Sequence, residues 1–176
     1  MATSLQPVDV FDAVRTVLAV RSYRLDPVPE DVLHRILEAG RLSASAGNGQ
    51  PWHFVVVEDL DTIREVGRRV KTGPYVAGAP LVIAVAVQRS QWALSDVSRA
   101  IQSMLLTAWA DGVGSNWAGG PGILDDLKPL LGIPDDLDVV AVLPFGYPAQ
   151  PTGRGKKKRK PLREIAHRER FGEPFE

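Results

Sequence analysis

The sequence contains no cysteine, and this absence removes several classes of chemistry. A chain without thiols has no disulfide framework, no thiolate nucleophile and no cysteine-containing zinc site. Its three histidines, His34, His53 and His167, stand far apart without metal-binding spacing, so we expect no metal site. Any redox chemistry must therefore depend on a bound cofactor.

Long hydrophobic runs are also missing. A membrane-spanning helix needs roughly 18 consecutive apolar residues, whereas the longest run here, residues 79–87, has the length of a strand. Asp9, Asp12 and Arg15 interrupt the mildly apolar N-terminal stretch, which lacks the basic start of a signal peptide. We expect a soluble, cytoplasmic protein with no membrane partner, folded as a single domain over residues 1–176.

Net charge is absent as well, because 21 basic residues balance 21 acidic ones. The balance hides a cationic segment, residues 154–160, without which 15 basic residues face 21 acidic ones. Such a segment binds phosphate or another polyanion, or is simply solvated. Its six cations are Arg154, Lys156, Lys157, Lys158, Arg159 and Lys160.

Hydrophobic periodicity predicts several helices and a few strands. Residues 80–87 show too little polar alternation for an exposed strand, so we place this strand at the centre of a sheet. Central strands among more numerous helices favour an α+β or α/β sandwich. The expected helices cover residues 9–20, 29 to about 40–42, 63–70, 95–111 and 161–165, and the other extended segments cover 52–57, 115–118 and 139–145.

Two guanidinium groups flank a hydroxyl at Arg21, Ser22 and Arg24, just after the first expected helix. Arginine binds two phosphate oxygens at once, so this cluster suits a phosphate. Basic residues at a helix C-terminus also complement the helix dipole, and the pattern alone leaves both interpretations open.

A loop of small and polar residues follows the second expected helix. Its glycines let the backbone approach a ligand closely, and Ser45, Asn48 and Gln50 offer groups that read a ring edge or a polyol. An ordinary loop explains the small residues equally well. It does not explain why Gln50, Pro51 and Trp52 lead directly into a buried strand. The segment reads Ser45-Ala46-Gly47-Asn48-Gly49-Gln50-Pro51-Trp52.

A glycine-rich turn at residues 117–120 is able to present backbone N–H groups to a ligand, with the cationic segment supplying further charge. Other nucleotide and hydrolase motifs are excluded. Gly112 and Gly114 begin a dinucleotide fingerprint, but Trp117 occupies the place of the third glycine. The spacing of a phosphate-binding loop and a G-x-S-x-G element are both missing.

In this order, the segments resemble the nitroreductase family of FMN enzymes over nearly the whole chain. The most specific part is the run from Asn48 through Gln50 and Pro51 to Trp52. The chain departs from the family pattern at Val20 and His53, where arginine is common, and at Ala44, where proline is usual. The other matching segments are Arg21-Ser22-Tyr23-Arg24, Gly112-Val113-Gly114, Trp117-Ala118-Gly119-Gly120, Gly146-Tyr147-Pro148 and Lys157-Lys158-Arg159-Lys160-Pro161-Leu162.

The resemblance implies an α+β fold, a three-layer sandwich with a central, mostly antiparallel sheet flanked by helices. It also implies an intertwined homodimer with FMN at the subunit interface. Arg21, Ser22 and Arg24 would hold the phosphate and ribityl end, and Lys157 and Arg159 would close on the same phosphate. Ring and ribityl contacts would come from Ser45, Ala46, Asn48 and Gln50, in part from the partner subunit, and from Ala118, Gly119 and Gly120 near the reactive N5.

The implied activity is electron transfer from NADH or NADPH through FMN to a small oxidised acceptor, such as a nitroaromatic or a quinone. The flavin carries the chemistry, so we assign no catalytic side chain. One alternative is a flavin- or deazaflavin-binding member without nicotinamide turnover. Another is a polyanion or nucleic-acid binder using residues 154–160, although no interleaved aromatics favour base stacking and we expect no nucleic-acid partner. Short segments around residues 57–80 and 87–96 leave little material for a lid over the substrate.

Overall fold

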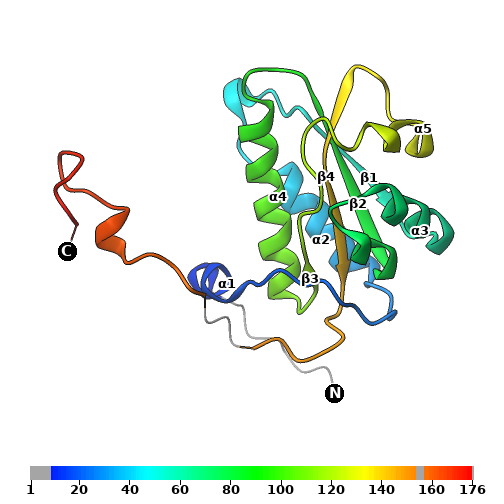
Figure 1. Ribbon diagram of the computed structural model, residues 1–176, viewed down its shortest axis with the longest axis horizontal. Coiled ribbons are helices and arrows are strands. Elements are labelled where there is room, and N and C mark those ends of the chain that lie inside the picture. The colour runs from blue at the N-terminus through cyan, green and yellow to red at the C-terminus, as the bar shows by residue number, and fades with distance from the viewer. Residues whose placement is uncertain (1–8, 154–156, 176) are drawn as a thin grey trace.

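The computed structural model describes residues 9–153 and 157–175 and has a four-stranded antiparallel sheet at its centre, in the order β1-β2-β4-β3 (Figure 1). One face of the sheet is covered by α2 and α4, and the other by α3 and α5. The expected α+β architecture is confirmed. Its elements are α1 (Val10–Thr16), α2 (Glu30–Arg41), β1 (Trp52–Val57), α3 (Leu60–Arg69), β2 (Leu81–Gln88), α4 (Ala93–Ala110), β3 (Gly114–Ser115), α5 (Lys128–Leu131) and β4 (Leu137–Gly146).

The strand β2 is buried on both sides, as its apolar sequence predicts. Successive side chains of a strand point to opposite faces of the sheet. Leu81 and Ile83 accordingly join the core formed with α2 and α4, whereas Val82 and Ala86 join the core formed with α3. Residues 81–87 are each at most 1% exposed, so a polar residue at any of them would lose its hydration.

Helix α4 is the longest helix in the described residues and the main cover of one sheet face. Its buried positions follow the helical period, which is why the sequence predicted this helix well. These positions are Asp96, Val97, Ala100, Ile101, Met104 and Ala108, and Asp96 is the one charged residue among them.

The first helix is shorter than predicted, since α1 ends at Thr16 instead of Val20. The chain is extended from Val17 onwards, where Ala19 pairs with Ser115 in parallel and the Val20 N–H donates to the Ser115 carbonyl at 2.9 Å. This pairing with a distant strand outweighs the local helical spacing of the valines. The closing helix expected over residues 161–165 is also wrong, since the chain forms only a 3-10 turn at Leu162–Glu164. Short 3-10 turns at Ala46–Asn48 and Pro74–Gly78 and a helical stretch at Asp125–Leu131 were not predicted.

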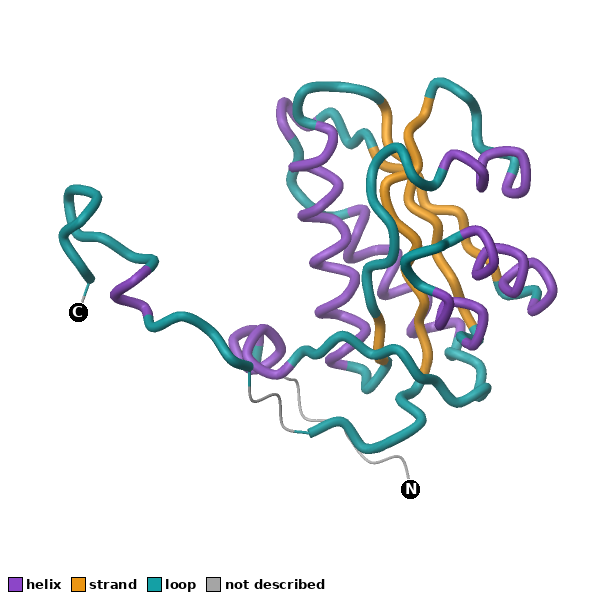
Figure 2. Tube along the Cα trace, viewed as in Figure 1, coloured by secondary structure: helices purple, strands orange, loops and turns teal. Residues whose placement is uncertain are grey.

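The C-terminal segment from residue 157 passes α1 and extends away from the rest of the chain (Figures 1 and 2). It exposes large apolar side chains, including Leu162, Ile165 and Phe171. Among the described helices, none combines the length and the apolar character that crossing a membrane requires.

Candidate functional site

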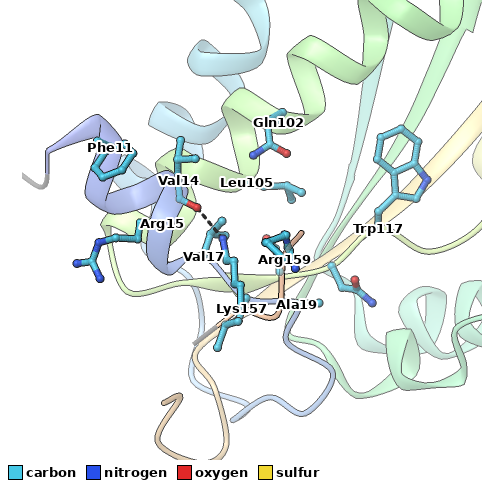
Figure 3. A pocket seen from close by; sticks show the side chains of 13 residues that line it. Phe11, Val14, Arg15, Val17, Ala19, Gln102, Leu105, Trp117, Lys157 and Arg159 are labelled. Atoms are coloured by element: carbon cyan, nitrogen blue, oxygen red, sulfur yellow. Dashed lines mark hydrogen bonds between the residues drawn. The ribbon is translucent and has the colours of Figure 1, made fainter. Parts of the chain in front are cut away.

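A cavity of about 730 Å³ lies between α1, α4 and the segment that follows β3 (Figure 3). Helix α1 contributes an apolar wall, α4 contributes Gln102 and Leu105, and the polar Ser115 and Asn116 line the sheet side. The C-terminal segment adds two cations. The lining residues are Phe11, Val14, Arg15, Val17, Leu18, Ala19, Gln102, Leu105, Ser115, Asn116, Trp117, Lys157 and Arg159.

The two C-terminal cations at this cavity, Lys157 and Arg159, lack a neutralising partner in the described parts of the chain. The cavity lining there includes no carboxylate, and neither cation forms a salt bridge with a described residue. The Lys157 Nζ donates to the Val14 carbonyl at 2.6 Å, at the end of α1. Burial, followed by the positive charge of Arg159, lowers the pKa of Lys157. A bound anion would relieve this repulsion, so the pair is suited to a phosphate.

A chain of polar contacts leads from the cavity wall to Arg21. Asn116 is 8% exposed and its Nδ2 donates to the Tyr75 Oη at 2.5 Å. The Arg21 guanidinium carbon lies 5.7 Å from the centre of the Tyr75 ring. Arg21 does not line the cavity itself, but the half-buried Tyr75 links it to Asn116 on the cavity wall.

The other members of the N-terminal cluster are placed differently. Ser22 is exposed, and its carbonyl accepts a hydrogen bond from Ala149. Arg24 pairs with Asp26 at 3.1 Å and lines a separate hollow of about 410 Å³. The helix-dipole interpretation of this cluster is wrong, because α1 ends five residues before Arg21.

The glycine-rich turn offers fewer free N–H groups than the sequence suggested. Ala118 exchanges both of its backbone hydrogen bonds with Val142 at 2.9 Å, and the Gly119 N–H donates to the Thr72 Oγ1 at 3.2 Å. For the Gly120 N–H, the described residues provide no hydrogen-bond partner. Between Ala118 and Gly120, Gly120 is thus the position able to donate to a ligand without breaking a bond recorded among the described residues.

The loop from Ser45 to Gln50 lies at the opposite end of α4. Its Ala46 contacts Asp96 near the start of α4, whereas α1 contacts Trp109 near the end of that helix. Thirteen residues of α-helix span about 20 Å. None of Ser45, Ala46, Asn48 and Gln50 is among the residues that line the cavity of Lys157 and Arg159, so one chain does not place the two sets in the same pocket. Within the cationic segment, Arg154 and Lys156 lie outside the described residues.

Comparison with known proteins identifies the lineage of the chain. The sequence profile described as the Nitroreductase family matches residues 15–76 and 67–147. The chain belongs to the nitroreductase family. It is 32% identical, over 82% of its length and 80% of the relative's, to a Methanothermobacter thermautotrophicus protein named as a candidate NADH dehydrogenase/NAD(P)H nitroreductase.

Solved structures of this family have the same fold. A Bacteroides thetaiotaomicron protein, named in the same way, superposes with a TM-score of 0.84 at 25% identity, covering 92% of this chain and 98% of its own. A Clostridium difficile protein described as an FMN-dependent nitroreductase superposes with a TM-score of 0.82 at 22% identity, covering 92% and 99%. The expected nitroreductase-like fold is therefore confirmed.

Some residues at the candidate site of this nitroreductase-family chain escaped the sequence analysis. Asn116 carried a usable signal, since it is an amide inside a short extended piece with apolar neighbours. Asp96 carried another, because it is a charged residue in register with the buried stripe of α4. Tyr75 and Gln102 carried none, because their positions depend on packing between distant segments.

Proposed function

We propose that this protein is an FMN-dependent oxidoreductase that passes electrons from NADH or NADPH to a small oxidised acceptor. The observation that carries the proposal is the pair Lys157 and Arg159, which lacks a described carboxylate partner and lies on the wall of a large, mostly apolar cavity. Membership of the nitroreductase family and the NAD(P)H-linked names of its relatives support the same activity.

In this proposal Lys157 and Arg159 bind the FMN phosphate, together with Arg21 and Ser22. Arg24 joins them only if its contact with Asp26 opens, because that contact now holds its guanidinium. The backbone around Ala118, Gly119 and Gly120 faces the flavin ring, with the Gly120 N–H as the available donor. When bound, FMN supplies the hydride or electron transfer, and the residues of the chain bind and orient it.

The complete site is proposed to form between two copies of the chain. Ser45, Ala46, Asn48 and Gln50 are not among the residues that line the cavity of Lys157 and Arg159, and in this proposal a second copy brings them to it. Apolar surface is available for such contact. Val10 and Phe11 on α1 are 75% and 69% exposed, and Leu162, Ile165 and Phe171 are exposed on the C-terminal segment. In water, apolar surface of this extent favours association with another protein surface.

Purification followed by rapid-mixing kinetics tests the proposal. The protein should be yellow, release FMN on denaturation, and show bleaching of its flavin absorbance on mixing with NADH or NADPH. A colourless protein that fails to take up FMN would contradict the proposal. A flavin that neither nicotinamide reduces would instead indicate a flavin- or deazaflavin-binding protein without nicotinamide turnover. Light scattering of the loaded protein should give the mass of two chains.

A further inference from the structure

The loop that contains Asn48 and Gln50 has an unusual backbone. Gly47, Asn48 and Gln50 have φ angles of +56°, +57° and +47°, in the left-handed region. Residues with a Cβ rarely adopt this region, and Gln50 does so directly before Pro51. Such a conformation persists only where the surrounding structure holds it, and it is concentrated at ligand-binding positions.

Most of the contacts that hold this loop lie within it. The Ser45 Oγ accepts the Gln50 N–H at 2.9 Å, and the Gln50 Nε2 donates to the Asn48 carbonyl at 3.3 Å. The side-chain contact that ties the loop to the sheet-covering helices comes from Asp96, whose Oδ1 and Oδ2 both lie 3.1 Å from the Ala46 nitrogen.

The burial of the Asp96 carboxylate costs free energy, and the stability of helix α4 does not depend on it. Asp96 is 3% exposed, and a carboxylate loses hydration when it is buried without full compensation. The residue at the N-cap of α4 is Trp92, so Asp96 does not cap this helix. Its one ionic partner in the described residues, Arg99, lies 3.4 Å away and is 58% exposed, which makes that pair weak. The stronger consequence of its burial is the fixed position of Ala46.

Empty space beside the loop means that its conformation depends on the contact between Asp96 and Ala46. A hollow of about 220 Å³ separates part of the loop from residues 88–92, and Ala46, Gly49 and Asp96 line it. A loop released from Asp96 therefore has room to settle into the hollow and to lose its left-handed turns.

We propose that Asp96 is a positioning residue that holds the Ser45–Gln50 loop, through the Ala46 N–H, in the one conformation that presents Asn48 and Gln50 to FMN. This inference rests on the proposed function. It assigns to a residue of α4 a role in cofactor affinity without contact between Asp96 and the cofactor.

Two substitutions remove the contact from opposite sides. Asp96→Ala deletes the acceptor, and Ala46→Pro deletes the donor. Proline suits the first position of a helical turn, and Ser45, with φ of −137° and ψ of 160°, has the extended backbone that a following proline requires. Asp96→Asn keeps an acceptor oxygen in place. Ser98→Ala is the matched control, since Ser98 is a half-buried residue of α4 whose hydroxyl, within the described residues, donates only to the Leu94 carbonyl of its own helix.

The measurement is the FMN dissociation constant of each apoprotein by flavin fluorescence, with amide hydrogen exchange in residues 45–50 as a second readout. Asp96→Ala and Ala46→Pro should each weaken FMN binding at least about tenfold and speed exchange in the loop, as loss of one hydrogen bond to a charged group predicts. The double variant should be no weaker than either single variant, because both remove the same contact. Asp96→Asn should stay within about threefold of wild type, and Ser98→Ala should match it.

Wild-type affinity in either Asp96→Ala or Ala46→Pro, or effects that multiply in the double variant, would overturn the role of Asp96 while leaving FMN binding established. Should Asp96→Ala fail to fold, Ala46→Pro and Asp96→Asn still decide between these outcomes. Failure of the wild type itself to bind FMN would instead overturn the proposed function, and this inference with it.

Discussion

Replacement of Gly119 by alanine tests whether the glycine-rich turn is held rigidly against the core. Gly119 has a φ of +87°, and a Cβ built there would lie 2.5 Å from the Leu124 Cδ1 and within 2.9 Å of two more carbons of that side chain. An L-residue in this backbone region costs about 1–2 kcal/mol. Overpacking against a buried leucine, here 2% exposed, adds about 1–3 kcal/mol. We expect Gly119→Ala to lower the free energy of unfolding by about 2–5 kcal/mol.

Gly122→Ala is the control for this experiment. Gly122 has a φ of +76°, but a Cβ there would meet no atom within 4 Å, so only the backbone cost of about 1–2 kcal/mol applies. Urea unfolding of both apoproteins, monitored by circular dichroism at the same protein concentration, separates the backbone cost from the packing cost. Equal destabilisation by the two substitutions would refute the reasoning, since it would mean that Leu124 moves aside freely. A Gly119→Ala, Leu124→Ala double variant that is less destabilised than the sum of the two single variants would confirm the steric origin.

Three further outcomes follow from the charges and the buried phenol. Lys157→Ala and Arg159→Ala should each weaken FMN binding by roughly 10- to 150-fold, since a hydrogen bond to a charged group contributes about 1.5–3 kcal/mol; Lys160→Ala, outside the cavity lining, should change the dissociation constant little. Only the charged form of Lys157 attracts phosphate, and the pKa of Lys157 is lowered. FMN affinity should therefore begin to fall at a lower pH than it would with a lysine of ordinary pKa. FMN binding by Lys157→Arg, measured over the same pH range, should show no such fall because arginine stays charged. Burial raises the pKa of Tyr23 above its ordinary value of 10.0, so the folded state retains this proton longer than the unfolded state. Stability should therefore decline as pH rises above about 10, and urea unfolding of Tyr23→Phe should show a smaller decline.

The sheet and its covering helices were readable from the sequence because their signals are local. The segment 52–57 matches β1, and the apolar run of β2 reflects burial on both faces. The helical stretch from Asp125 to Leu131 was missed although acidic residues in its first turn and Pro129 near the start of α5 suit a helix. Its seven residues are too few to show a clear helical period.

The candidate site was only partly readable. The sequence singled out Lys157 and Arg159. It did not show that no described carboxylate lies beside them, because the other residues that line the cavity come from distant segments of the chain. The sequence also predicted a turn with open N–H groups. In the structure, Thr72 takes the N–H of Gly119, a contact between residues 47 positions apart that no local pattern reveals.

The sequence by itself determined the family, the order of the motifs and the strand at the centre of the sheet, because each depends on residue types within a few positions of one another. Only the tertiary structure decided where these motifs lie. Pairing of Val20 with Ser115 ended α1 early and carried Arg21 to Tyr75, and the length of α4 set the Ser45–Gln50 loop apart from the cationic pair. Such placements arise from packing between distant segments. Each contact joins residues that are far apart in the sequence, so no local pattern reveals it.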